Sequence, residues 1–367
     1  MKILFLDGTR GFTPTRLKEK PTGGIATSLT LLPRYLAQKG LDVSVMHQNN
    51  KGEVIEGVKY VQPPISNNCW DVVVFNRNLL NHSLVKGFES SRKIWWLHDI
   101  VDPDYLPDGS YRSMDDVVAL SRYNQRSYAD YYDIPITKFH IIPNGVDKTV
   151  FYPGTGKRDR NTYICASAPI KGLGALKFML HNMRRHNPSF KLNMYVSQRL
   201  HDLENSSLQN SLLDELKALG ADVREPIPQH DLAEEMRHAW ALCMPNTYPE
   251  NCSNIALQAR ACGLPVVSVP IGSMPEQVSH RVNGLLTETI PSDLHWHHKD
   301  FAVQCMNLYD EAGLQETLSA NAPLGIHDWS SIGDRWFKLL TENKKWEAAR
   351  ASTISTAPGQ TLADVRS

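Results

Sequence analysis

The sequence predicts an α/β protein made of two Rossmann-like, doubly wound domains that follow one another along the chain. Three observations lead to this fold class. The length of 367 residues suggests two domains, at ~150 residues per domain. Short apolar runs alternate with helical patterns, which is typical of parallel sheets covered by crossover helices. This alternation stops at a turn-rich segment near the middle of the chain and then starts again.

The first domain is expected over residues 1–150. The run ILFL (3–6) predicts a buried strand, and a helical pattern begins at Ile25 and stops at Gly40. Further apolar runs predict strands at 43–46, 71–75, 93–97, 116–120 and 140–143, with a helix over 121–132. The polar stretch 144–160 is rich in turn formers and is interpreted as an interdomain linker.

The second domain is expected over residues 151–328. Its strands are predicted at 162–167, 191–197, 221–226, 241–245 and 265–270, and its helices at 172–186, 208–219, 231–239 and 253–262. A last helix is predicted over 330–347, within a separate segment, 329–348. The tail 349–367 is small and polar, so it is expected to be frayed.

Composition excludes several classes of protein. Basic and acidic residues are equal in number, 39 of each, which argues against nucleic acid as a partner, because phosphate binding needs an excess of cations. The six cysteines form no C-x-x-C pair and are expected to be free thiols in a reducing compartment. No apolar run reaches the ~18 residues of a membrane span. A cytoplasmic protein is expected, and the basic segment 10–20 predicts either a solvated loop or a peripheral contact with the inner face of the plasma membrane.

One strand-to-helix loop carries the main candidate site. In open α/β sheets, ligands bind outside the carboxyl ends of the strands. The loop after strand 241–245 ends at Ser253, a residue type favoured at helix N-caps, and the N–H groups near Cys252, Ser253 and Asn254 predict a diphosphate site. Glu250 and Gln258 flank this helix start and suit sugar hydroxyls. The alternative is that Glu250 only complements the helix dipole and Gln258 is a surface residue.

Two other loops are candidates for the same ligand. Gly23 and Gly24, in PTGGI, allow the backbone to approach a ligand in front of a helix, although a flexible turn is an equally good interpretation. Lys171, in ASAPIKGLG, places a cation at the end of a strand, where it suits a phosphate. That loop lacks the third glycine of a dinucleotide fingerprint, because position 177 is lysine, so a nicotinamide site is rejected.

Three polar motifs remain. His98 follows strand 93–97 and suits a substrate hydroxyl, or is structural. Asp102 and Asp104 form a D-x-D pattern that can chelate a divalent metal, but a three-residue pattern has low specificity. The histidine-rich stretch 295–298 lacks a cysteine or acid at ligand spacing and is interpreted as surface. No metal site is therefore expected.

Taken together, these loops resemble the family 4 glycosyltransferases, which are retaining enzymes that use nucleotide sugars and have two Rossmann-like domains facing across a cleft (the GT-B type). Four stretches carry the resemblance, in order along most of the chain: PTGGI, residues 121–147 ending in PNGVD, YICASAPIKGL (163–173), and residues 247–286 with PENCSNIALQARACGLPVV. The resemblance implies an acceptor-binding first domain, a donor-binding second domain, and a terminal helix, 329–348, that crosses back to the first.

The resemblance also implies roles for single residues. Catalysis would involve Glu250, His98 and Lys171. The donor would be held by Gly23, Gly24, Lys171, Arg224, Glu250, Asn251, Cys252, Ser253, Asn254 and Gln258. Two positions depart from the family pattern. Gln258 stands where the second of two glutamates is usual, which removes a charge beside the ribose, and the phosphate-binding arginine is replaced by small residues around Ala166 and Ser167.

The expected reaction is the transfer of a sugar from a UDP- or GDP-sugar to a glycan or lipid-linked acceptor in cell-surface polysaccharide or glycoconjugate synthesis. It is expected to retain the anomeric configuration and to need no metal or other cofactor, because Lys171 and backbone N–H groups would stabilise the leaving diphosphate. Four alternatives remain at this point: a phosphorylase, a sugar-nucleotide epimerase, a metal-dependent transferase using Asp102 and Asp104, and a non-catalytic binding protein with the same fold.

Overall fold

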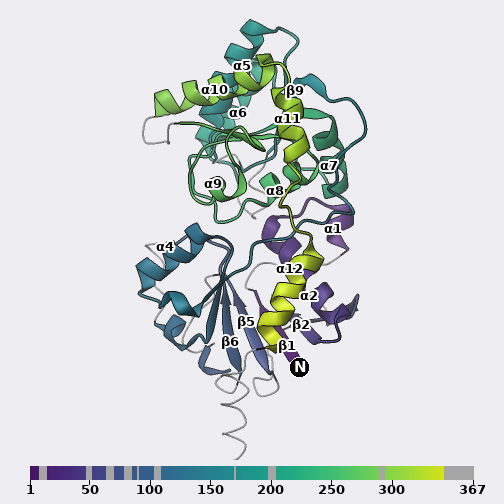
Figure 1. The fold of residues 1–367 in the computed structure, drawn as a ribbon, viewed down its shortest axis with the longest axis vertical. Coiled ribbons are helices and arrows are strands. Elements are labelled where there is room, and N and C mark those ends of the chain that lie inside the picture. Colours follow the sequence, from purple (N-terminus) through teal and green to yellow (C-terminus); the bar gives the residue numbers. More distant parts are fainter. Residues whose placement is uncertain are drawn as a thin grey trace, which may run out of the picture.

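The computed structural model describes residues 1–7, 15–46, 52–62, 70–77, 85–88, 91–102, 109–168, 171–196, 204–288 and 294–342. Within these ranges the chain forms two α/β domains, one above the other in Figure 1, each with a central sheet and helices on its faces. The predicted α/β fold with two doubly wound sheets is confirmed. The described ranges contain no helix with both the length and the apolar character needed to cross a bilayer.

The first sheet has the strand order β3-β4-β2-β1-β5-β6-β7-β8. Its strands are β1 (Lys2–Leu6), β2 (Asp42–Met46), β3 (Val54–Ile55), β4 (Val58–Val61), β5 (Val72–Asn76), β6 (Arg92–Trp96), β7 (Asp116–Ala119) and β8 (Phe139–Ile141). All pairings are parallel except the hairpin between β3 and β4. The apolar runs of β1 and β5 are buried on both faces because helices cover the sheet on both sides.

The second sheet has the order β11-β10-β9-β12-β13-β14 and is parallel throughout. Its strands are β9 (Asp159–Cys165), β10 (Lys191–Tyr195), β11 (Asp222–Arg224), β12 (Ala239–Met244), β13 (Val266–Ser268) and β14 (Gly284–Leu286). The chain reverses direction across the sheet between β9 and β12, so the carboxyl ends of these two strands flank the switch point at which ligands bind in such folds.

The helices connect these strands or pack on them. They are α1 (Arg16–Glu19), α2 (Gly24–Gln38), α4 (Arg122–Tyr132), α5 (Leu173–His186), α6 (Ser207–Ala218), α7 (Gln229–His238), α8 (Asn254–Ala261), α9 (Met274–Gln277), α10 (Leu294–Asp310), α11 (Leu314–Asn321) and α12 (Trp329–Thr341), with short 3-10 turns at Ser110–Ser113 and Ile136–Lys138. Helix α5 follows β9 and α8 follows β12, whereas α2 follows β1 after the short helix α1.

Helix α12 follows the last helix of the second domain but packs on the first. In Figure 1 it lies beside α2 in the lower domain. Its Trp336 is fully buried, 5.0 Å from the ring of Trp96, and Arg92 donates a hydrogen bond to the carbonyl of Leu339. Arg92 is itself buried and is neutralised by Asp116 on β7, at 2.6 Å. The chain therefore crosses between the domains a second time.

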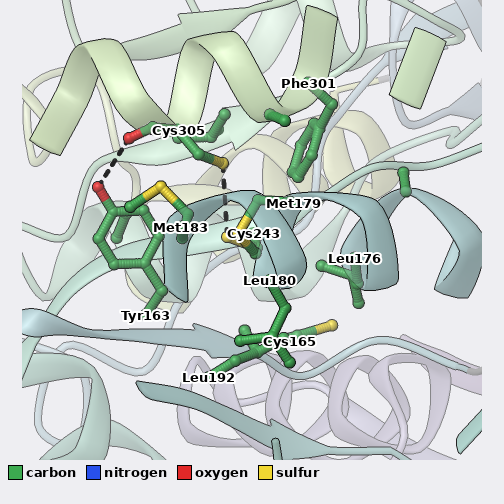
Figure 2. Close-up of a cluster of buried hydrophobic side chains, with 14 of the residues drawn as sticks. Tyr163, Cys165, Leu176, Met179, Leu180, Met183, Leu192, Cys243, Phe301 and Cys305 are labelled. Carbon is green, nitrogen blue, oxygen red and sulfur yellow. Dashed lines mark hydrogen bonds between the residues drawn. The ribbon is translucent and has the colours of Figure 1, made fainter. Parts of the chain in front are cut away.

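Several elements were not predicted. The sequence analysis assigned no structure to the β3–β4 hairpin, β14, α9 or α11, and it interpreted residues 295–298 as surface. The surface interpretation is wrong for His297, which lies on α10 and has no exposed surface. Helix α10 packs on α5 and turns Phe301 and Cys305 into the core of the second domain (Figure 2), where the hydroxyl of Tyr163 donates to the carbonyl of Cys305 at 3.0 Å. Its apolar side is interrupted by histidines, which hid the helical pattern.

Candidate functional site

A cleft of about 490 Å³ lies between the two domains, at the carboxyl ends of both sheets. Most of the predicted site residues line it. From the first domain these are Gly23, Gly24 and His98, and from the second they are Lys171, Glu250, Asn251, Cys252, Ser253, Asn254 and Gln258. The cleft is therefore formed by loops that lie far apart in the sequence but all follow the carboxyl ends of strands, where ligands bind in such sheets.

Two helix starts meet in the cleft. Helix α2 begins behind Gly23, which has no side chain to cap it, and α8 begins behind Ser253, whose side chain makes no capping bond. A Cβ atom on Gly24 would lie 2.2 Å from the amide nitrogen of Asn254, so the glycine allows the two helices to approach each other. Both helix dipoles present partial positive charge to the same space, which favours an anion there.

The structure corrects one detail of the predicted diphosphate site. The backbone N–H of Ser253 donates to Oε1 of Gln277 at 2.8 Å, so this N–H already has a partner. Gln277 also donates to the carbonyl of Ser253 at 3.1 Å, and these two bonds fix the start of α8. Ser253 occupies the N-cap position as predicted, but its side chain makes no capping bond. Gln277 lies 24 residues further along the chain, and no local pattern predicts this contact.

Lys171 and Glu250 form an ion pair inside the cleft. Nζ of Lys171 lies 2.5 Å from Oε1 of Glu250, and their side chains are 22% and 14% exposed. The amide of Asn246 donates to the same carboxylate oxygen at 3.0 Å. The next residue, Gly172, has a φ of 105°, which glycine adopts readily. A Cβ atom at this position would lie 2.0 Å from the carbonyl oxygen of Pro245, so the glycine allows the close approach that places Lys171 beside Glu250. Lysine and glutamate thus act as one unit, with a cation available to a phosphate and a carboxylate available to hydroxyls.

His98 lies at the floor of the cleft as a neutral ring. Burial, and secondarily the charge of Arg77, lowers its pKa to about 3. Its ring packs 4.4 Å from that of Trp96, and its Nε2 has no hydrogen-bond partner. Asn251 of the second domain donates to the carbonyl of His98 at 3.3 Å. A neutral imidazole can exchange a hydrogen bond with a sugar hydroxyl without carrying charge.

Several buried polar atoms around the cleft lack partners. They are Nε2 of His98, Oγ of Ser167 and Oδ1 of Asn251, which all belong to residues that line the cleft, and Oδ1 of Asn246 beneath it. Buried polar groups are almost always hydrogen-bonded in folded proteins. Their concentration here indicates that a polar ligand completes the site.

Arg224 stands apart from this arrangement, and some other predicted groups lie outside the described residues. Arg224 on β11 does not line the cleft, and its guanidinium pairs with Asp222 and donates to the hydroxyl of Tyr195 at 3.0 Å. Because Tyr195 does line the cleft, Arg224 is connected to the cleft through the side chain of Tyr195. Asp104 lies outside the described residues, and so do much of the segment 10–20 and the tail 349–367. The described residues contain no group of three or more potential metal ligands of the His, Cys, Asp or Glu type.

Two charged residues in the cleft were missed by the sequence analysis. Arg77 directly follows β5, and Asp99 follows His98. Their side chains form an ion pair, with Nε of Arg77 at 3.0 Å from Oδ2 of Asp99. The rule that ligands bind at the carboxyl ends of strands was sufficient to find both, because each lies within three residues of a strand end.

Comparison with known proteins agrees with this geometry. Residues 167–302 match the model of the group 1 glycosyl transferases. A sucrose-phosphate synthase from Thermosynechococcus elongatus superposes with a TM-score of 0.72 over 96% of this chain and 100% of that one, at 15% identity. HepE from Anabaena, solved in complex with UDP and glucose, gives a TM-score of 0.70 at 17% identity, over 93% of this chain and 100% of its own. The chain therefore has the fold of these two structures, the GT-B fold, and its second domain is similar in sequence to the group 1 glycosyl transferases.

The curated relatives that this chain matches share less of their length with it. A D-inositol 3-phosphate glycosyltransferase of Paenarthrobacter aurescens (strain TC1) is 26% identical over 232 residues, which are 59% of this chain and 55% of that protein. The chain spans about half the length of the curated relatives it matches. The region that matches the family model, residues 167–302, includes Lys171 and Glu250.

Proposed function

We propose that this protein is a retaining, metal-independent glycosyltransferase that uses a nucleotide-diphosphate sugar. One observation carries the proposal: the starts of α2 and α8 converge on the Lys171–Glu250 pair within a single interdomain cleft. Two helix N-termini and an ammonium group suit a diphosphate, and the adjacent carboxylate suits the hydroxyls of the attached sugar. The group 1 glycosyl transferase match over residues 167–302 and the UDP complex of HepE support this assignment.

The mechanism follows from where charge develops. As the bond between the anomeric carbon and the diphosphate breaks, negative charge grows on the leaving oxygen. Lys171 and the dipoles of α2 and α8 are fixed in place before the reaction, so they stabilise this charge without reorganisation. Glu250 holds the sugar, and neutral His98 lies on the opposite domain with its Nε2 free to bond a sugar hydroxyl.

Retention is proposed to occur by attack on the same face of the sugar. The acceptor oxygen forms the new bond to the anomeric carbon while the diphosphate leaves, and the acceptor proton passes to the departing phosphate oxygen. Glu250 is bound to Lys171 and Asn246, which suits a holding role better than that of a nucleophile. Gln258 lines the cleft on α8 and is proposed to bond the ribose in place of the usual glutamate.

The wider biological assignment is also a proposal. UDP is favoured as the nucleotide because HepE binds UDP and UDP-glucose. The proposed acceptor is a glycan or lipid-linked molecule of cell-surface synthesis, and the proposed location is the cytoplasm, with peripheral membrane association through the segment 10–20. Separation of cell extracts into soluble and membrane fractions, with a high-salt wash, tests that location.

The decisive experiment measures nucleotide release from a panel of UDP-, GDP- and ADP-sugars, with and without a chelator. We expect one donor to be turned over at an undiminished rate in EDTA. Release of no nucleotide from any donor despite nucleotide binding would favour a non-catalytic binding protein. Phosphate-dependent turnover without a nucleotide would favour a phosphorylase. A rate abolished by EDTA and restored by Mg²⁺ would contradict metal independence.

Glu250→Gln is the first variant to make. It keeps the size of the side chain but removes the charge that pairs with Lys171 and grips the sugar. We expect turnover to fall by about 10²-fold or more, with UDP affinity changed much less, because the lost interactions belong to the transition state. Glu215→Gln, at an exposed ion pair on α6, is the matched control and should behave as wild type. Normal turnover in Glu250→Gln would contradict the assignment.

A further inference from the structure

Arg77 adopts a backbone conformation that is unusual for its residue type. Its φ is 64°, in the left-handed region that favours glycine, asparagine or aspartate. The conformation is held from both sides, because the N–H of Arg77 donates to the carbonyl of Trp96 at 2.9 Å and the indole of Trp95 donates to the carbonyl of Arg77 at 2.6 Å. A glycine would satisfy this backbone at lower cost, so the arginine side chain itself is what the position requires.

The side chain is used inside the cleft. Nε and Nη2 of Arg77 contact both carboxylate oxygens of Asp99 at 3.0–3.3 Å. The two side chains are 34% and 27% exposed, so the pair remains accessible from the cleft that both residues line. An ion pair between a fork of donors and a carboxylate presents hydrogen-bond donors and acceptors side by side, with no net charge.

The pair is fixed next to the proposed donor site. The hydroxyl of Tyr128 donates to the backbone carbonyl of Asp99 at 3.0 Å. Asn251, the residue after Glu250, donates from the second domain to the same carbonyl and to that of His98. Nε2 of His98 and Oδ1 of Asn251 are buried without partners on either side of this contact. Asn251 thus connects the loop that carries His98 and Asp99 to the loop that carries Glu250.

We propose that Arg77 and Asp99 are the specificity-determining pair for the acceptor, and that the acceptor they bind is an uncharged polyol. Asp99 accepts a hydrogen bond from one hydroxyl, and Arg77 donates to the oxygen of its neighbour. A third hydroxyl of the acceptor attacks the anomeric carbon, and its proton leaves with the diphosphate. A phosphate at this place would be attracted by Arg77 and repelled by Asp99, so the neutral pair offers no net positive charge to hold it. This inference rests on the proposed function.

The test compares neutral and anionic probes on the full-length protein. UDP release from the active donor is measured with myo-inositol, methyl α-mannoside and inositol 3-phosphate, and UDP binding is measured by calorimetry. We expect the wild type to be accelerated by a neutral probe and not by inositol 3-phosphate. Asp99→Asn should raise KM for the neutral probe about tenfold or more and reduce the discrimination against the phosphorylated one, with UDP affinity within twofold of wild type.

Two further variants make the outcome sharp. Arg77→Lys keeps the positive charge but loses the fork, so it should weaken the neutral acceptor without creating a preference for phosphate. Asp115→Asn, whose carboxylate accepts from the N–H of Lys93 at the amino ends of β6 and β7, away from the cleft, should leave all parameters unchanged. Preference of the wild type for inositol 3-phosphate, or acceleration by no neutral probe, would overturn the inference while leaving UDP binding and donor turnover intact. Absence of both would instead refute the proposed function.

Discussion

At the scale of single residues, Lys171 shows how one side chain serves both binding and organisation. Its ammonium lies 2.5 Å from the carboxylate of Glu250, and a diphosphate offers it a second anionic partner. Glu250 also bonds Asn246, so it keeps one partner when the lysine turns to phosphate. The pair therefore prevents an uncompensated carboxylate from repelling the incoming diphosphate.

Lys171→Ala is predicted to weaken UDP binding by about 10- to 100-fold, the usual effect of losing a hydrogen bond to a charged group. Isothermal calorimetry checks this. Lys177→Ala removes an exposed lysine of α5 that pairs with Glu215, so it provides a control with the same change in net charge. Equal UDP affinities for the two variants would exclude the phosphate role of Lys171.

The buried neutral ring of His98 makes a second prediction at this scale. Its pKa falls from 6.5 to about 3 on folding, so the unfolded chain binds a proton that the folded chain excludes between these values. Stability is then fully present above pH 6.5 and falls as the pH drops, with a slope of up to about 1.4 kcal/mol per pH unit. In urea titrations between pH 6.5 and 4.5, the free energy of unfolding of His98→Gln should fall less steeply with decreasing pH than that of the wild type. His238→Gln, which changes an exposed histidine, should show the same slope as the wild type.

At the scale of elements, the start of α5 depends on a close approach of two backbones. Gly172 caps this helix with φ 105° and lies against the carbonyl of Pro245 at the end of β12. The contact places the Lys171 loop beside the loop that carries Glu250. The same kind of approach occurs at Gly24, where α2 meets Asn254, so glycines determine how closely the binding elements converge.

Gly172→Ala is predicted to lower the free energy of unfolding by about 2 kcal/mol or more, because strain at φ > 0 adds to a clash with backbone. UDP affinity should fall with it, since Lys171 is displaced. Gly313→Ala is the matched control: Gly313 also caps a helix at positive φ, but a Cβ there meets nothing within 4 Å. It should lose only about 1 kcal/mol, with UDP affinity unchanged. Chemical denaturation and calorimetry measure both quantities.

At the scale of the whole molecule, the two domains are joined by polar contacts around the cleft. Glu276 of the second domain accepts hydrogen bonds from the N–H groups of Arg122 and Tyr123, at 2.9 and 2.8 Å, at the start of α4 in the first domain. Gln229 donates to Thr27, and Asn144 donates to Asn254, across the same interface. Polar interfaces of this kind permit hinge motion, and closure would exclude water from the reaction.

Glu276→Ala is predicted to open the cleft, because it removes the two hydrogen bonds that join the second domain to the start of α4 in the first domain. Small-angle scattering should show a larger radius of gyration without ligand and a return towards the wild-type value with saturating UDP. Glu311→Ala removes a carboxylate that pairs with Arg281 inside the second domain and should leave the radius unchanged. An unchanged radius in Glu276→Ala would show that other contacts hold the domains together.

The sequence by itself determined most of the strands and helices, though not the β3–β4 hairpin, β14, α9 or α11, and most of the loops in which the cleft residues lie. Apolar runs such as ILFL, the helical pattern from Ile25, and the glycines of PTGGI report local geometry and burial, and these properties depend on near neighbours. The same reasoning failed at α10, because histidines on its buried side resemble a surface pattern.

Only the tertiary structure decided which groups act together. Lys171 meets Glu250 across 79 residues, Gln277 accepts from the N–H of Ser253 that a ligand was expected to use, and Arg224 contacts Tyr195 but does not itself line the cleft. Arg77 meets Asp99 through the left-handed backbone after β5. Such contacts depend on how two sheets and their loops are placed relative to one another, and no periodicity within a segment encodes that placement.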